Sequence, residues 1–344
     1  MQRKGVTWYI VYAVLSGAGL ATADEYKVKL PLGLQEEALY VPEDNPLTEE
    51  KVALGKQLYF DKRLSIDNTV ACASCHNPRF GFTDGKPVST GIKGQKGGRS
   101  APTTINRAFS KEQFWDGRAA SLEDQAKGPI ANPIEMGFTP EGVVKRLRGI
   151  KGYGDQFQKV FGTADFTIDH VAKAIAAYER TILSGNSPFD KYQAGDKTAL
   201  SEAAQRGLAL FNGKANCFRC HTGFNFTDEG FRNIGVGWDS GKKEFTDTAH
   251  YQVTKKEGDK GAFKTPTLRN IAQTAPYMHD GSKKTLEDVV EYYGRGGTPN
   301  PYLAAEVKPL NLTVSEKKDL VAFLRSLTGE IPKAAVTEPI RFPQ

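Results

Sequence analysis

The stretch that decides the fold reads Cys72-Ala-Ser-Cys75-His76, and its pattern returns as Cys217-Phe-Arg-Cys220-His221. Each copy is a C-x-x-C pair followed at once by histidine, which is the attachment signature of c-type haem. In such a site both thiols bond to the porphyrin and the histidine ligates the iron. The chain has no further cysteine, so disulfides or a redox dithiol explain the two copies less well. We therefore predict two covalently bound haems, with His76 and His221 as iron ligands.

Other short stretches around the haem motifs also occur twice and in the same order. The clearest pair is Ser121-Leu-Glu-Asp124 and Thr285-Leu-Glu-Asp288, which stand 164 positions apart. Each half then ends in a helical pattern of apolar residues, over 168–183 in the first half and 315–327 in the second. Strand-like alternation is almost absent. We therefore expect an all-α protein made of two tandem cytochrome c-like domains.

The repeat and the two ends of the chain set the expected boundaries. Residues 1–23 have the basic start, the apolar run and the Ala-Thr-Ala end that are typical of a secretory signal peptide, although an uncleaved membrane anchor has similar features. Either reading predicts export, and we expect the periplasm. The first haem domain is expected over 24–190, the second over 198–330, and a C-terminal tail over 331–344.

Composition agrees with a globular protein of two domains. The chain has 344 residues, of which 39% are hydrophobic and 25% are charged. Its formal charge of +6 is spread along the sequence without a long basic run, so nucleic acid is not expected as a partner. The remaining histidines are His170, His250 and His279. We expect the first two to be solvated and the third to pack in the interior or to bind a haem propionate.

Several motifs resemble the bacterial di-haem cytochrome c peroxidases, a family that includes the MauG proteins. They are the two haem motifs, Phe114-Trp-Asp-Gly-Arg118, Gly128-Pro-Ile-Ala-Asn-Pro-Ile-Glu-Met136, and the segment 265–280. The resemblance covers essentially the whole chain after the signal peptide. It implies a peroxidatic haem in the first domain and an electron-transfer haem in the second.

The sixth iron ligands would separate the two roles. By resemblance, Tyr293 stands where typical members have the methionine ligand of the second haem, as it does in MauG-like members, and Met278 is the alternative ligand. A phenolate is hard and anionic, so it would favour ferric iron. In the first domain, the loop 91–99 lacks the histidine that closes the haem of many members, and Pro129 cannot ligate iron. The first haem is therefore expected to be open.

The resemblance also assigns roles to residues near the first haem. Glu135 would be the acid and base that moves the peroxide proton, Gln125 a distal amide, and Trp115 the residue between the two haems. The family further implies a calcium ion between the domains. Thr274 and Pro276 match its backbone ligands. Ser100 replaces the expected asparagine, which would weaken the site or remove it.

Three functions remain open at this stage. The first is reduction of hydrogen peroxide to water with electrons from a small periplasmic cytochrome c or cupredoxin. The second, favoured by Tyr293 and the missing loop histidine, is MauG-like oxidation of Trp or Tyr side chains in a partner protein. The third is a non-enzymatic di-haem electron carrier, which the shortage of His and Met ligands disfavours. A homodimer is compatible with each of them.

Overall fold

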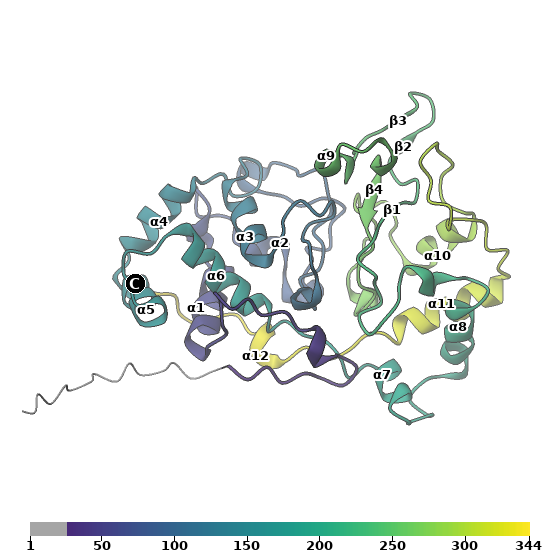
Figure 1. Ribbon diagram of the computed structural model, residues 1–344, viewed down its shortest axis with the longest axis horizontal. Helices are drawn as coiled ribbons and strands as arrows, with labels where there is room; N and C mark the ends of the chain where they lie inside the picture. Colours follow the sequence, from purple (N-terminus) through teal and green to yellow (C-terminus); the bar gives the residue numbers. More distant parts are fainter. Residues whose placement is uncertain (1–25) are drawn as a thin grey trace, which may run out of the picture.

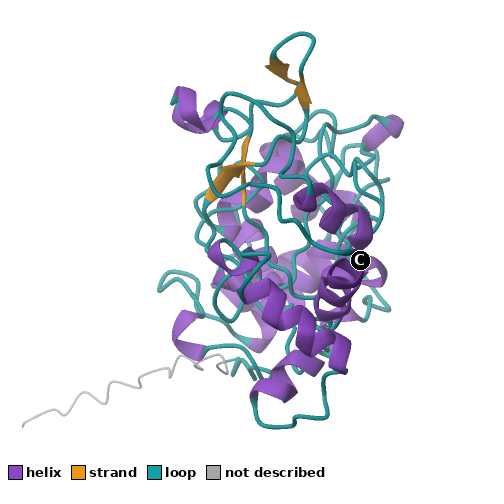
Figure 2. Ribbon diagram, turned by 90° about the vertical axis from the view of Figure 1, so that its right-hand side faces the viewer, coloured by secondary structure: helices purple, strands orange, loops and turns teal. Residues whose placement is uncertain are grey.

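The computed structural model describes residues 26–344, so the predicted signal peptide lies outside the described residues. Two helical halves lie side by side, and long loops connect the helices (Figures 1 and 2). The helices are α1 Glu49–Phe60, α2 Cys72–Cys75, α3 Leu122–Ala131, α4 Pro140–Arg148, α5 Lys151–Phe161, α6 Ile168–Glu179, α7 Pro188–Gln193, α8 Glu202–Asn212, α9 Tyr251–Thr254, α10 Leu286–Gly294, α11 Val314–Arg325 and α12 Lys333–Val336. The predicted all-α class is confirmed, with a helical core in each half. Within residues 26–344, each helix is too short or too polar to cross a bilayer.

Each half is built on a crossed pair of helices, α1 with α6 and α8 with α11. Glycine allows the backbones to touch at both crossings. A Cβ atom on Gly55 would lie 1.8 Å from the carbonyl oxygen of Ala174, and one on Gly207 would lie 2.0 Å from that of Asp319. Because only glycine tolerates this approach, the same residue stands at the same place in both halves. The sequence repeat is therefore a repeat of packing.

The last helix of each half ends earlier than the sequence pattern predicts, α6 at Glu179 and α11 at Arg325. Just beyond each helix end, an asparagine side chain forms hydrogen bonds with the backbone. In the first half, the Asn106 side chain accepts from the Ser184 amide at 2.8 Å and donates to the Ser184 carbonyl at 3.1 Å. In the second half, the side chain of Asn270 makes the same two contacts with Gly329. The backbone groups of Ser184 and Gly329 therefore bond to asparagine side chains and do not extend the helix.

Two apolar cores lie on the two sides of the molecule. The first contains Leu58, Phe157 and Ile175, and the second contains Phe211 and Phe323. The C-terminal segment returns to the first core, where Ala335 is buried (Figure 1). There the Tyr178 hydroxyl donates to the Ala335 carbonyl at 2.6 Å, and the Gly152 amide donates to the Gln344 carbonyl at 2.8 Å. The predicted tail 331–344 is thus packed against the first half.

The halves differ by two insertions. Helices α4 and α5 extend the first half, whereas the second contains the strands β1 Phe231–Asn233, β2 Trp238–Asp239, β3 Glu244–Phe245 and β4 Ala262–Lys264. Strand β1 pairs antiparallel with β4, with Phe231 opposite Lys264, and β2 pairs antiparallel with β3. Strands of two or three residues are too short for a period-2 pattern to develop, so the sequence did not predict them.

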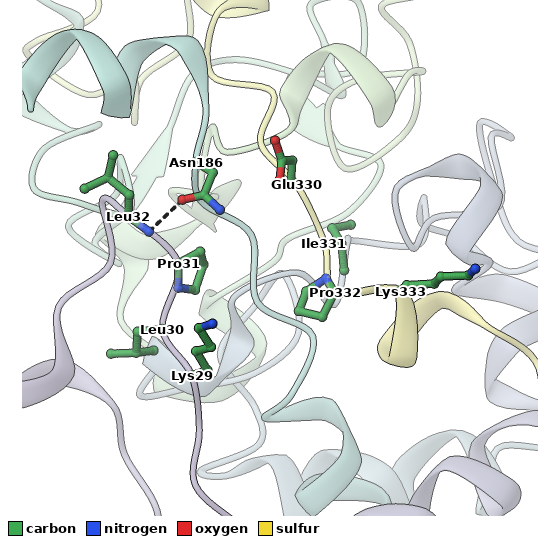
Figure 3. A pocket seen from close by; sticks show the side chains of 9 residues that line it. All are labelled: Lys29, Leu30, Pro31, Leu32, Asn186, Glu330, Ile331, Pro332 and Lys333. Atoms are coloured by element: carbon green, nitrogen blue, oxygen red, sulfur yellow. Dashed lines mark hydrogen bonds between the residues drawn. The ribbon is translucent and has the colours of Figure 1, made fainter. Parts of the chain in front are cut away.

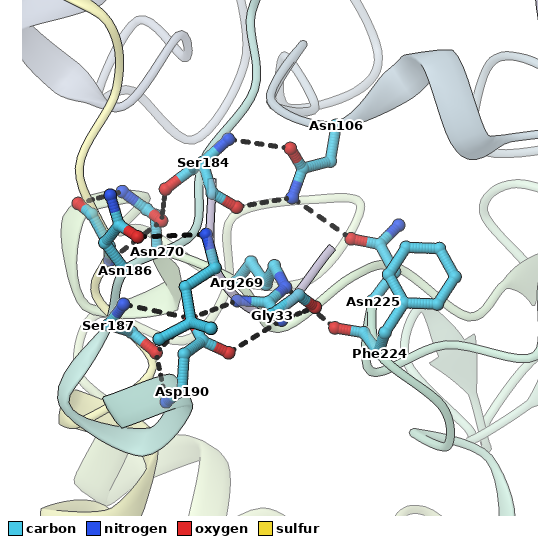
Figure 4. Close-up of polar contacts among 12 residues, drawn as sticks. Gly33, Asn106, Ser184, Asn186, Ser187, Asp190, Phe224, Asn225, Arg269 and Asn270 are labelled. Atoms are coloured by element: carbon cyan, nitrogen blue, oxygen red, sulfur yellow. Dashed lines mark hydrogen bonds and ion pairs between the residues drawn. The ribbon is translucent and has the colours of Figure 1, made fainter. Parts of the chain in front are cut away.

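A buried polar network joins the halves through the linker helix α7 (Figure 4). The Arg269 guanidinium donates to both carboxylate oxygens of Asp190 at 2.9 and 3.0 Å, and both side chains are buried. Arg269 also donates to the Gly33 carbonyl at 2.8 Å, which brings in the N-terminal segment. Asn106 reaches Asn225 of the second half at 3.3 Å. Breaking a buried ion pair is costly, so this network fixes the halves relative to each other.

Candidate functional site

The two motif histidines are held in the same orientation. The Nδ1 atom of His76 lies 3.3 Å from the Phe82 carbonyl oxygen, and that of His221 lies 3.0 Å from the Phe226 carbonyl oxygen. Because a carbonyl can only accept, this contact favours the tautomer with the proton on Nδ1, in which the lone pair of Nε2 can bind iron. Burial lowers the pKa of both histidines, which favours the neutral form that binds metal.

None of the four motif cysteines is paired in a disulfide, so all four sulfur atoms are available for attachment to haem. Burial raises the pKa of the Cys72, Cys75 and Cys217 thiols, as expected for sulfur atoms that face an apolar site. A thiol pair beside an imidazole with a free Nε2 is the donor set of a covalently attached haem. The residues of both motifs therefore fit the predicted cofactor.

A cavity of about 490 Å³ opens beside the first motif, which is within the usual size of cofactor and ligand sites. It brings together residues that the sequence analysis named separately. Its lining includes Cys75, His76, Ser100, Trp115, Gln125, Pro129 and Glu135. The predicted residues of the first haem site thus share one cavity. Asp247 and Gln252 of the second half also line it, so both halves build the site.

Glu135 follows helix α3, and its carboxylate is held by a neighbour: the Asn132 side chain donates to Glu135 Oε1 at 2.9 Å. Burial raises the pKa of Glu135, while the charge of Arg118 and the Asn132 hydrogen bond oppose this shift. A raised pKa suits a carboxyl group that first accepts a proton and then returns it. Gln125 and Pro129 lie on α3 and face the same cavity.

The glycine-rich loop 91–99 packs against the segment that carries Glu135. A Cβ atom on Gly91 would lie 1.9 Å from the Ile134 carbonyl oxygen, so glycine is required there. At the other end of the loop, Arg99 donates to Asp116 at 2.6 Å and to Asp247 of the second half at 2.6 Å. Both ends of the loop are therefore fastened to the cavity wall, while its middle, residues 93–96, is exposed.

Trp115 lies where the two halves meet. Its indole Nε1 donates to the Ser100 carbonyl at 2.9 Å, and its own carbonyl accepts from the Lys264 amide of β4 at 2.8 Å. Its counterpart in the repeat, His279, is buried, and its ring stacks on Phe263 with centroids 3.6 Å apart. Burial lowers the pKa of His279 to about 4. These contacts agree with the packing role expected for His279.

Two further histidines stand outside the haem motifs. We expected His250 to be solvated, but it makes contacts within the protein. Its ring stacks on Phe231 at 3.6 Å, and its Nδ1 donates to the Asp116 carbonyl at 2.8 Å across the junction of the halves. His170 is only partly buried and accepts from the Thr167 amide at the start of α6.

Tyr293 lies on α10 and faces the second haem motif. Burial raises its pKa above the usual range, and the neighbouring thiols of Cys217 and Cys220 add to the shift. Part of the residue remains exposed. Met278, the alternative ligand, has φ +71°, and its counterpart Phe114, with φ +66°, lines the first cavity.

The residues of the predicted calcium site lie at the junction of the halves. The Ser100 amide donates to the His279 carbonyl at 2.6 Å, and the Ser100 hydroxyl donates to the Lys86 carbonyl at 3.4 Å. The Thr274 side chain lies beside Gly81 of the first half. Pro276 stands between Thr274 and His279 in the same segment.

One residue of the first cavity escaped the sequence analysis. Glu179, the last residue of α6, is 4% exposed and lines the same cavity as Glu135. A carboxylate within the apolar pattern of Ile175, Tyr178 and Ile182 was the feature that could have revealed it.

A second cavity of about 390 Å³ lies away from both haem motifs (Figure 3). It is bordered by the N-terminal segment 29–32 and by residues 330–333, and the Leu32 amide donates to Asn186 at 2.9 Å beside it. Its charged side chains are Lys29, Glu330 and Lys333. The predicted catalytic residues are not among those that line it.

Two family models match the chain, one described as di-haem cytochrome c peroxidase over residues 49–198 and one described as cytochrome c over residues 204–328. The chain is 42% identical to the methylamine utilization protein MauG of Methylorubrum extorquens, over 97% of this chain and 96% of that relative. It is 39% identical to the cytochrome c551 peroxidase of Nitrosomonas europaea, over 93% of this chain and 89% of that relative. The crystal structure of a MauG-like protein associated with microbial copper homeostasis is also similar, with a TM-score of 0.84 and 35% identity over 92% of this chain and 100% of that chain.

Proposed function

Since this chain belongs to the di-haem cytochrome c peroxidase family, which includes MauG, we propose that it reduces hydrogen peroxide to water in the periplasm with electrons from a small cytochrome c or cupredoxin. The family predicted from the motifs is confirmed, as are the oxidoreductase class and the pair of c-type haems. The observation that carries the proposed reaction is the cavity in which Glu135 and Gln125 face the first haem motif.

The chemistry of the cavity divides between the cofactor and the protein. When bound at His76, the haem supplies an iron that takes up peroxide and electrons. Glu135 takes the proton from one peroxide oxygen and returns it to the oxygen that leaves as water. The Gln125 amide donates a hydrogen bond that holds the peroxide in place. Both roles require Glu135 and Gln125 to lie beside the bound peroxide, and both residues line the first cavity.

Neighbouring residues keep Glu135 in position. Asn132 holds one carboxylate oxygen, and Arg118 supplies a positive charge that stabilises the ionised form. Arg118 is itself fixed over the Phe114 ring at 3.5 Å and by Asp116 at 2.9 Å. A fixed carboxylate loses little entropy when it meets the substrate.

Trp115 provides a contact through which electrons could pass from the second half to the first. It lines the first cavity and its carbonyl accepts from β4 of the second half. Its large oxidisable ring shortens the distance over which an electron must tunnel. We propose this residue as the bridge between the haems.

The proposed function is tested with the variant Glu135→Gln, which keeps the shape of the side chain but cannot take a proton. The rate of peroxide consumption in rapid mixing should fall by about 10²- to 10⁴-fold, the usual contribution of general acid–base catalysis. Glu141→Gln, on the exposed side of α4, is the matched control and should keep the wild-type rate. Equal rates for wild type and Glu135→Gln would overturn the proposal.

The position of Tyr293 favours a second candidate function, MauG-like oxidation of Trp or Tyr side chains in a partner protein. A phenol beside the second motif would make that haem a weak electron acceptor, which suits storage of oxidising equivalents better than rapid turnover. The two candidates are separated by comparing steady-state turnover with reduced cytochrome c and peroxide-dependent modification of a protein encoded by a neighbouring gene. Slow turnover with efficient modification identifies the second function.

We also propose a weak calcium site at the junction of the halves, with backbone oxygens of Thr274 and Pro276 and the Ser100 hydroxyl as ligands. Oxygen ligands suit calcium, but a neutral hydroxyl binds it less well than an amide or carboxylate oxygen.

A further inference from the structure

Glu179 is a buried carboxyl group without a protein partner. It is 4% exposed, and its Oε2 atom is buried without a hydrogen bond within residues 26–344. Such a group lowers stability compared with one that has a hydrogen-bond partner. An unsatisfied polar group on a core helix therefore needs an explanation, and its position in the wall of the first cavity suggests one.

The nearby positive charges are already engaged with other carboxylates. The Arg180 side chain donates to both oxygens of Glu123 at 2.6 and 3.1 Å. Arg107 donates to Ser110 at 3.2 Å and lies 4.0 Å from Glu229. Neither arginine donates to Glu179. The titratable groups around Glu179 are Arg180, Arg107, Glu123, Tyr59, Tyr178 and Cys72.

These surroundings favour the protonated form. Burial raises the pKa of Glu179 to about 8, although the charges of Arg180 and Arg107 oppose this shift. Burial also raises the pKa of Glu135 in the same cavity, where the charge of Arg118 and the Asn132 hydrogen bond oppose it. Both carboxyl groups thus hold a proton more tightly than in water, and Glu179 has the contacts of a group that is protonated at neutral pH.

The balance of the reaction requires such an acid. Reduction of one peroxide molecule breaks its O–O bond, takes up two electrons and two protons, and forms two water molecules. Glu135 only moves the proton that peroxide brings with it. The two additional protons must enter the cavity from outside, and a carboxyl group in its wall can deliver one of them.

We propose that Glu179 stores one of these protons and releases it into the first cavity. A proton from solvent then restores the neutral carboxyl group. The electrons come from the small cytochrome or copper protein, and the second proton comes from solvent. This inference rests on the proposed function, because it concerns the protons that peroxide reduction consumes.

The second half offers a natural control residue. Leu324 occupies the position of Glu179 in the repeat, since Tyr178 packs on Gly55 as Phe323 packs on Gly207. Glu179→Leu therefore introduces a residue that this fold already accepts at that place. Glu179→Gln keeps the shape and the neutral charge but cannot release a proton. Full haem loading of both variants is checked by the content of two porphyrins per chain.

The first measurement is independent of activity. The infrared spectrum of the haem-loaded wild-type protein at pH 7 should contain the carbonyl band of a buried protonated carboxyl group. The band should disappear above about pH 8, and it should be absent in Glu179→Gln and Glu179→Leu. Persistence of the band in these variants, or its absence in the wild type, overturns the inference.

The second measurement is the pH profile of peroxide consumption under single-turnover conditions. The wild-type rate should fall above about pH 8, whereas both variants should react about 10²-fold more slowly at pH 7 and lack this limb. Wild-type rates and profile in Glu179→Gln overturn the inference but leave the proposed function intact. A wild-type protein that does not consume peroxide overturns both.

Discussion

The two halves of the molecule have the same frame and different linings. Both have the glycine crossing, the asparagine contact after the last helix and the histidine held by a phenylalanine carbonyl. Where the first half has Gln125, Pro129 and Glu179, the repeat places Val289, Tyr293 and Leu324 in the second. The frame thus suits haem attachment in both halves, and under the proposed function these lining residues would divide the chemistry between them.

The sharpest way to break this division is Tyr293→Met. A neutral thioether favours ferrous iron more than a phenolate does, so the reduction potential of the second haem should rise by about 0.1 V or more, within the range of about 0.8 V that axial ligands control. Spectroscopic redox titration measures both haems at once, and the first haem should keep its potential. The same titration of Met278→Leu is the control. A shift in that variant instead would make Met278 the ligand.

The shared frame can be tested with Gly55→Ala and Gly207→Ala. The added methyl group would meet a backbone carbonyl in each case, so each variant should lose about 3 kcal/mol of unfolding free energy, at the upper end of the usual cost of overpacking. Gly154→Ala, within α5, is the control because open space surrounds its Cβ position. That variant should be neutral or more stable by up to about 1 kcal/mol. Denaturant unfolding gives all three values, and equal behaviour of the three variants would contradict the packing argument.

Glu179→Leu makes the first lining resemble the second and should stabilise the protein. Because the folded-state pKa of Glu179 is raised from 4.5 to about 8, the folded state binds its proton more tightly than the unfolded state. Wild-type stability should therefore fall as pH rises between about 5 and 8. The variant should lack this decline and gain about 1–3 kcal/mol at pH 8, but less at pH 5. Unfolding at the two pH values provides the test, and a gain independent of pH would contradict it.

The smallest expected effect concerns the junction of the halves. Ser100→Asn should strengthen calcium binding by less than about 1 kcal/mol, because an amide oxygen is a better calcium ligand than a hydroxyl. Bound calcium is measured by mass spectrometry after dialysis against graded concentrations of a chelator. If the variant and the wild type lose no calcium because neither contains any, the site does not exist.

The sequence predicted what depends on local pattern. Haem attachment needs five consecutive residues, and the helices α6 and α11 follow from apolar periodicity, so both were readable. It did not predict the position of His250 on Phe231 or the clamp from Arg99 to Asp247. Such contacts join distant parts of the chain and leave no local pattern. Glu179 was missed because its environment comes from several elements at once.

The return of the C-terminal segment to the first half has a consequence for biogenesis. Ala335 and Phe342 belong to the first core, and Arg63 donates to the Pro343 carbonyl at 3.0 Å. These residues follow the second half in the sequence, so the first half cannot reach its finished packing until the segment beyond the second half has been synthesised. A deletion within residues 331–344 would therefore disturb the core of the first half more than that of the second.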